Sequence, residues 1–344
     1  MTTAASSASE RAGRGTPVQR LRAGALSLVS RVACRLPERP LLALADVVGW
    51  LWYRLAPARA AQARLNLERV ARELDRRGST DLRIRAAARD SQALERLVKS
   101  AFRQNARYYL EVLRVGAYDL DTALAQIRIE DDEMVRAALR EQSPVIVVGM
   151  HYGAIELPVT ILSGFTGHPV MAPMETVDDP ALAAWFAASR RRVGVNVIPI
   201  RDARRALVGA IRRGESVGLV ADRDLTGSGL PVPLFGHPAP IAAGPGLLAL
   251  ETGAPVYAAS TRRLGVGRYA ARLALVPAPT DGSRRERLTA YTQAIARAFE
   301  AIVVDAPEQW WGAFHPIWPD LIAGAVGSAG SAGEGGPATS EAAP

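Results

Sequence analysis

The chain has 344 residues, of which 49% are apolar and 22% charged, and its formal net charge is +8. This length and composition are typical of one large or two modest globular domains and exclude a chain that is disordered throughout. The single cysteine, Cys34, excludes an internal disulfide and a cysteine-based zinc site.

The N-terminal part is predicted to be helical. Residues 1–16 consist mainly of Ala, Ser, Thr, Gly and Arg, and we expect them to be disordered. Residues 17–142 form the predicted helical region. A membrane-spanning helix needs about 20 apolar residues. The best candidate, 41–56, is shorter than that and is interrupted by Asp46 and Arg54.

The first helices combine positive charge with apolar and aromatic side chains. Residues 1–60 contain nine arginines and only three acidic residues. Apolar side chains recur at three- and four-residue steps on one helix face, and aromatic residues follow: Leu21, Ala25, Leu28, Val32; Trp50, Trp52, Tyr53. This pattern fits a helical region that contacts the surface of an anionic membrane. The alternative is a helical cap that packs its aromatic residues against the main domain.

From residue 143 onward, strand-like and helix-like segments alternate. The predicted strands are 144–150, 168–172, 195–200, 216–221, 255–261 and 269–275, and the predicted helices are 154–163, 180–192, 203–213, 244–252 and 284–304. Such alternation predicts an α/β fold with a twisted, mostly parallel sheet flanked by helices. We expect an α/β core over 143–322, continuous with the helical region, and a disordered low-complexity tail over 323–344.

Two charged side chains follow strand-like runs. His151 comes after "VIVVGM", and Asp222 comes after "SVGLVA". In open α/β sheets, ligands bind beyond the carboxyl ends of the strands. Both residues are therefore candidate site residues.

The stretch "GMHYGAIE" places Glu156 five residues after His151. Because His151 precedes the helix, its ring can fold back toward Glu156, which would fix the tautomer and leave the other ring nitrogen as a base. Free amides at the start of the same helix would suit a developing oxyanion. The simpler alternative is a capping histidine beside a surface glutamate.

A second group of charges, "VADRDL", follows the strand that ends at Ala221. Asp222 and Asp224 are candidate acceptors, and Arg223 is a candidate partner for a thioester oxygen or a phosphate. A salt-bridged loop is the alternative. Glu175 and the arginine run that begins at Arg190 form a third group, although cations at a helix C-terminus also oppose its dipole.

Several familiar chemistries lack their motifs. The sequence contains no HExxH, GxxxxGK[ST] or GxSxG, and no GxGxxG after a strand. The segment "EQWWGAFHPIWPD" is interpreted as core packing or membrane contact. The positive charge sits largely in the helical N-terminus without a recognition motif, which argues against nucleic-acid binding.

Taken together, these blocks resemble the bacterial lysophospholipid acyltransferase superfamily. The resemblance is carried by "GMHYGAIE", by "ADRDLTGSGLPVPLFGHPAPIAAGPG", by "ARLNLERV" at 63–70 and by "PEQWWGAFHPIW". It spans roughly residues 18–320. Within the superfamily it is closest to the branch that holds the late lipid A acyltransferases and the phosphatidylinositol mannoside acyltransferases.

The resemblance implies a role for each candidate residue. His151 would be the general base, assisted by Glu156 and Asp222. Glu175, Arg190, Arg223 and Asp224 would bind substrate. In the mannoside enzymes the first block ends in Asp and the second begins with Glu, whereas Glu156 and Asp222 are exchanged here. The acid that pairs with His151 therefore stays open, and so does the acceptor.

The implied function is a membrane-associated O-acyltransferase with the glycerolipid acyltransferase-like fold. It would move a fatty acyl chain from acyl-CoA or acyl-ACP to a hydroxyl of a glycolipid, with a phosphatidylinositol mannoside favoured over a lipid A-type acceptor. It would need no cofactor and no metal, and it would lie peripherally on the cytoplasmic face of the bacterial cell membrane. A non-catalytic lipid-binding protein on the same fold is the alternative.

Overall fold

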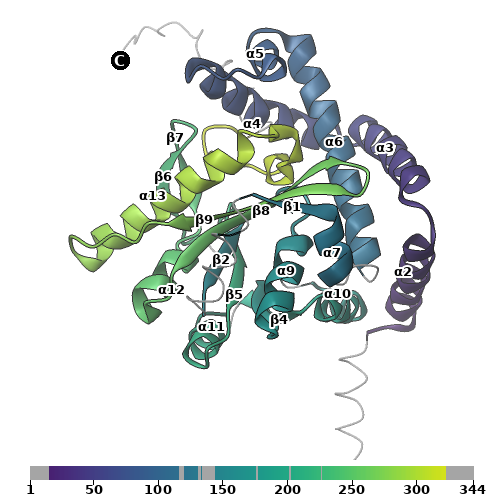
Figure 1. Cartoon of the computed structure of the whole chain (residues 1–344). Coiled ribbons are helices and arrows are strands. Elements are labelled where there is room, and N and C mark those ends of the chain that lie inside the picture. Colours follow the sequence, from purple (N-terminus) through teal and green to yellow (C-terminus); the bar gives the residue numbers. More distant parts are fainter. Residues whose placement is uncertain are drawn as a thin grey trace, which may run out of the picture.

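The computed structural model shows a mostly parallel sheet flanked by helices, with a helical N-terminal region (Figure 1). It describes residues 15–115, 120–130, 133, 144–175, 177–200, 203–225 and 227–322. The predicted fold class is confirmed. Most of the segment expected to be disordered at the N-terminus, the expected tail at 323–344 and the expected boundary near 142 lie outside the described residues.

Helices make up most of the N-terminal region. They are α2 (Pro17–Arg35), α3 (Glu38–Leu55), α4 (Pro57–Arg76), α5 (Leu82–Arg89), α6 (Ser91–Arg114) and α7 (Leu120–Gln126). Thr16 caps α2 in a capping box with Gln19, and Asp90 caps α6 by accepting from two backbone amides. No helix within the described ranges is long and apolar enough to cross a membrane.

The aromatic residues of α3 divide between the interior and the surface. Trp52 packs against Phe102 of α6, with ring centroids 5.5 Å apart, whereas Trp50 is 51% exposed. Gly49 allows α3 and α6 to approach closely, since a Cβ at this position would lie only 2.6 Å from the Cα of Arg103. Trp52 therefore packs inside the protein, as the helical-cap alternative expects, whereas membrane contact by the exposed Trp50 stays a prediction.

The surface of α2 and α3 is rich in large apolar side chains, and we call this the α2–α3 face. It comprises Val18, Leu21, Leu28, Val29, Val32, Leu44, Val47, Val48, Trp50, Leu51 and Leu55. Both helices lie at the outer edge of the molecule (Figure 1, purple). Of the residues in α2, only Ala33 is buried. Such an apolar surface marks an interaction site.

Seven strands form the main sheet, in the order β1-β9-β8-β2-β5-β3-β4. They are β1 (Ile127–Ile129), β2 (Ile146–Gly149), β3 (Val170–Met174), β4 (Val195–Pro199), β5 (Val217–Val220), β8 (Val256–Gly265) and β9 (Arg268–Val276). Among the described strands, β8 and β9 pair antiparallel and the other neighbours in this sheet are parallel.

Helices cover both faces of the sheet. They are α9 (Glu156–Thr166), α10 (Pro180–Arg192), α11 (Ala203–Arg212), α12 (Gly244–Thr252) and α13 (Arg284–Val303). Side chains of β2 alternate between the faces: Ile146 and Val148 join the large core cluster that contains Ile295 of α13. Val147 instead packs with Leu162 of α9. A strand buried on both faces explains the uninterrupted apolar run that ends at Met150.

Two elements were not predicted. The first is a hairpin of β6 (Leu230–Leu234) and β7 (His237–Ile241), in which two prolines of each strand face each other across the pair. Proline cannot donate to a strand ladder, so the sequence did not resemble a strand. The second is β1, a three-residue strand that pairs with β9 inside a region expected to be helical. Its three residues are too few for a period to be recognised.

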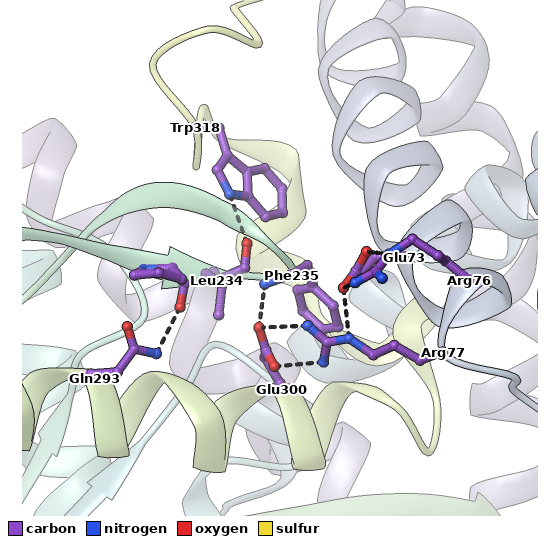
Figure 2. A network of polar contacts seen from close by, with 9 residues as sticks. Glu73, Arg76, Arg77, Leu234, Phe235, Gln293, Glu300 and Trp318 are labelled. Carbon is purple, nitrogen blue, oxygen red and sulfur yellow. Dashed lines mark hydrogen bonds and ion pairs between the residues drawn. The ribbon is translucent and has the colours of Figure 1, made fainter.

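A network of ion pairs ties the hairpin to α4 and α13 (Figure 2). Glu300 of α13 accepts from the backbone amide of Phe235, a fully buried residue in the hairpin turn whose φ is +47°. Glu300 also pairs with Arg77 at 2.7 Å, and Arg77 pairs with Glu73 of α4. The hydrogen bond from Arg76, joined by that from Arg77, lowers the pKa of Glu73 to about 2. Glu73 therefore stays ionised at neutral pH.

We expect Glu300→Ala to lower the free energy of unfolding by about 1–3 kcal/mol, because a buried amide loses its acceptor. Glu68→Ala is the control. It breaks an i,i+4 pair with Arg72 on the surface of α4, and exposed pairs contribute about 0–1 kcal/mol. Urea unfolding of both variants measures the difference. Equal losses would contradict a structural role for the network.

Candidate active site

The central contact joins the ends of two neighbouring parallel strands. Gly149, the last residue of β2, is paired with Val220, the last residue of β5. His151 and Asp222 each follow two residues later, so they lie at the same level of the sheet edge. His151 Nδ1 lies 2.7 Å from Asp222 Oδ1. The Asp222 side chain is 1% exposed and that of His151 16%, so the pair is shielded while the imidazole keeps access to solvent.

The charge state of Asp222 fixes the tautomer of His151. Burial raises the pKa of Asp222, but the nearby charge and hydrogen bond of His151 and the indole N–H of Trp310 outweigh burial and lower it. An ionised carboxylate only accepts hydrogen bonds. The proton of the neutral imidazole is therefore on Nδ1, which leaves the Nε2 lone pair free to act as a base.

The C-terminal aromatic segment contacts both His151 and Asp222, which its interpretation as core packing or membrane contact did not anticipate. The indole N–H of Trp310 donates to Asp222 Oδ2 at 2.8 Å. The amides of Trp311 and Gly312 donate to the carbonyl oxygen of His151 at 2.9 and 3.2 Å. The Trp311 ring also meets the imidazole edge-on, 4.5 Å between centroids. The presence of two adjacent tryptophans was the only sequence signal, and nothing in it pointed to a partner 88 residues away.

Glu156 does not pair with His151. It begins α9, and its Oε1 lies 3.4 Å from Nε of Arg190, near the end of α10. Arg190 also interacts with Tyr108, whose ring stacks on Trp311 at 4.3 Å. Glu156 is thus linked to Trp311 through Arg190 and Tyr108. The imidazole is therefore not folded back onto Glu156, because its Nδ1 faces Asp222 instead.

Three amides in the turn between β2 and α9 already have backbone acceptors, so they are not available as oxyanion donors. The amides of Tyr152, Gly153 and Ala154 donate to the carbonyl oxygens of Met150, Gln309 and Thr261 at 2.7, 3.0 and 3.0 Å. Gly153 has a φ of +54°, and a Cβ there would lie 2.0 Å from the Thr261 oxygen. Only glycine fits this turn, which is locked between β8 and the C-terminal segment.

The remaining candidates follow β5 or lie beside it. Arg223 approaches Glu175 at 3.8 Å and is 19% exposed at its side chain. Asp224 accepts from the amide of Gly229 at 2.7 Å, so it stabilises its own loop. Burial, followed by nearby arginines including Arg223, lowers the pKa of His315 to about 4. His315 is therefore neutral at pH 7. The described residues contain no group of three His, Cys, Asp or Glu side chains placed to hold a metal ion.

Comparison with known proteins identifies relatives of this chain. A phosphatidylinositol mannoside acyltransferase of Mycolicibacterium smegmatis is 27% identical over 289 residues, which cover 81% of this chain and 91% of that protein. Two phosphatidylinositol mannoside acyltransferases of Mycobacterium tuberculosis strains are each 29% identical over 153 residues, covering 43% of this chain and 46% of each relative.

The family model described as bacterial lipid A biosynthesis acyltransferase matches residues 84–319. This match takes in the sheet, both strand ends that carry His151 and Asp222, and the C-terminal tryptophans. It covers well over half of the chain and confirms the resemblance drawn from the motifs. The chain belongs to the bacterial lipid A biosynthesis acyltransferase family.

Proposed function

We propose that the protein transfers a fatty acyl chain from an acyl thioester, either acyl-CoA or acyl-ACP, to a hydroxyl of a glycolipid. The observation that carries this proposal is the 2.7 Å contact between His151 and the buried Asp222, which leaves Nε2 of the partly buried imidazole as the candidate base. Family membership supports acyl transfer. The similarity to phosphatidylinositol mannoside acyltransferases favours a phosphatidylinositol mannoside as acceptor, and the family makes a lipid A-type glycolipid the second candidate.

The proposed reaction needs one proton relay. Nε2 of His151 takes the proton of the acceptor hydroxyl as its oxygen attacks the thioester carbonyl carbon. The C–S bond then breaks, and the thiolate leaves with the proton from the imidazolium. Asp222 stabilises the imidazolium through Nδ1, and the guanidinium of Arg223 is our candidate to stabilise the charge that develops on the carbonyl oxygen. Glu175, Arg190 and Asp224 would shape the surrounding substrate site.

We expect His151→Ala to reduce transfer from palmitoyl-CoA by roughly 10²–10⁴-fold, the usual contribution of a general base. The exposed His168 offers the matched control, and His168→Ala should retain wild-type turnover. Product formation is measured by mass spectrometry with a phosphatidylinositol mannoside and a lipid A precursor as separate acceptors. Undiminished turnover by a folded His151→Ala variant would remove the base assignment, and the preferred acceptor in the wild type would decide between the two glycolipids.

An apolar cavity between α9 and the sheet offers a place for the acyl chain. Its lining comes from α9, β1, β2, β8 and β9: Ile129, Val147, Pro158, Ile161, Leu162, Ala259, Ser260, Ala271, Arg272 and Leu273. Because α9 begins five residues after His151, the cavity lies under the helix that leads away from the base. The cavity volume of about 40 Å³ has room for only the end of such a chain, and we infer that it receives that end.

Filling this cavity should change the acyl chain length that the enzyme accepts. We expect Ser260→Phe to lower transfer from palmitoyl-CoA several-fold relative to octanoyl-CoA, because the longer chain needs more of the apolar space. Ala274→Phe, on the neighbouring strand but outside the lining, should leave the ratio unchanged. Transfer rates with both donors give this ratio. An unaltered ratio in Ser260→Phe would show that the acyl chain binds elsewhere.

We propose that the α2–α3 face binds the cytoplasmic surface of the bacterial cell membrane. The exposed apolar side chains are accompanied by exposed arginines, among them Arg20, Arg31 and Arg54. Arg54 lies over the exposed Trp50 ring, 4.7 Å from its centroid. Apolar area buried among acyl chains and attraction to anionic headgroups together favour a peripheral mode of binding.

We expect Leu28→Glu combined with Leu51→Glu to weaken binding to vesicles that contain anionic phospholipid by at least tenfold, since each buried leucine contributes about 1.5–3 kcal/mol. Leu275→Glu changes an equally exposed leucine on β9 and should have no such effect. Co-sedimentation with the vesicles at low and high salt measures the apolar and the electrostatic contributions to binding. If the double variant and the control bind alike, the membrane surface is not this face.

A further inference from the structure

The buried indole of Trp310 is a group that the proposed reaction does not use directly. Trp310 is 0% exposed and Asp222 1%. Its Nε1 lies 2.8 Å from Asp222 Oδ2, while Oδ1 faces Nδ1 of His151 at 2.7 Å. Each oxygen of the carboxylate thus has its own donor. A buried carboxylate is costly unless such donors compensate its lost hydration.

The indole has little freedom to move. A Cβ on Gly312 would lie 2.5 Å from Asp222 Oδ2 and 2.7 Å from Trp310 Nε1, so the backbone presses directly against this hydrogen bond. On another side, the Trp318 ring meets Trp310 edge-on at 6.2 Å. The preceding Gln309 exchanges two hydrogen bonds of 2.8 Å with the backbone of Arg263 on β8. The donor is therefore held in place before any substrate binds.

We infer that Trp310 is a positioning residue that keeps Asp222 ionised and aims its Oδ1 at Nδ1 of His151. This inference rests on the proposed role of His151 as the base. Without the indole N–H, the charge of Asp222 loses one of the two groups that stabilise it. The histidine–aspartate pair would therefore bind a proton more tightly. The carboxylate would also lose one of the two contacts that orient it, which weakens the preference for the Nδ1–H tautomer.

The chain offers a matched pair of variants for the test. Trp318 is also 0% exposed, and its indole N–H donates to the carbonyl oxygen of Leu234 at 3.2 Å. Trp310→Phe and Trp318→Phe therefore remove the same group from two neighbouring buried sites. We expect Trp310→Phe to lower kcat about tenfold at neutral pH, the effect of a hydrogen bond to a charged group. Trp318→Phe should keep kcat within about twofold, since its partner is a neutral carbonyl.

The pH profile separates positioning from a general loss of stability. As pH falls, activity is lost when the histidine–aspartate pair takes up a proton. Removing the Trp310 donor makes that uptake easier, so the acidic limb should move to higher pH by about 0.5–1 unit in Trp310→Phe and stay in place in Trp318→Phe. Nitrogen-15 shifts of the His151 ring should report a single Nδ1–H tautomer in the wild type and a mixture in Trp310→Phe.

Further variants separate the possible failures. In an Asp222→Asn background, adding Trp310→Phe should cost little more, because Trp310 acts through Asp222. If the wild type transfers no acyl chain to either glycolipid, the proposed function itself fails, and if His151→Ala and Asp222→Asn are both fully active, the assignment of His151 as the base fails. If they are inactive but Trp310→Phe matches Trp318→Phe in acidic limb and tautomer, only the role of Trp310 is overturned. Should Trp310→Phe not fold, benzothienylalanine at position 310 preserves the ring shape without the N–H and must give the same shift.

Discussion

The site depends on keeping one carboxylate charged in the protein interior. Asp222 is almost fully excluded from solvent, and burial alone favours its neutral form. The imidazole of His151 and the indole of Trp310 reverse that preference by donating to one oxygen each. Every other feature of the site follows from this arrangement. The register of β2 and β5 sets the height of the two side chains, and the C-terminal segment closes over them.

The sequence predicted the sheet and the strand ends well because the signals are local. The apolar run before His151 and the charges after Ala221 both mark the point where a buried parallel strand reaches its edge. Parallel neighbours then place those edges side by side. The hairpin of β6 and β7 was missed for an equally local reason, since its prolines argue against a strand unless the partner strand is known.

The choice of acid could not be settled by spacing. Glu156 is five residues from His151 and Asp222 is 71 residues away, yet Asp222 makes the contact. The turn that holds Gly153 is bonded on three sides, so it directs Glu156 into α9 and toward Arg190 instead. The contact of Trp310 could not be predicted either, because no pattern within the aromatic segment indicates which buried carboxylate its N–H will meet. On α3, by contrast, Trp50 and Trp52 face opposite ways because two positions on a helix differ by about 200°.

The three groups at the centre of the site come from widely separated parts of the chain. Asp222 lies 71 residues after His151 and 88 residues before Trp310. A polypeptide still being synthesised, from which the last tryptophans have not emerged, therefore carries the base and its acid without the element that clamps them. Synthesis must therefore proceed beyond residue 310 before these three groups can meet and organise the centre.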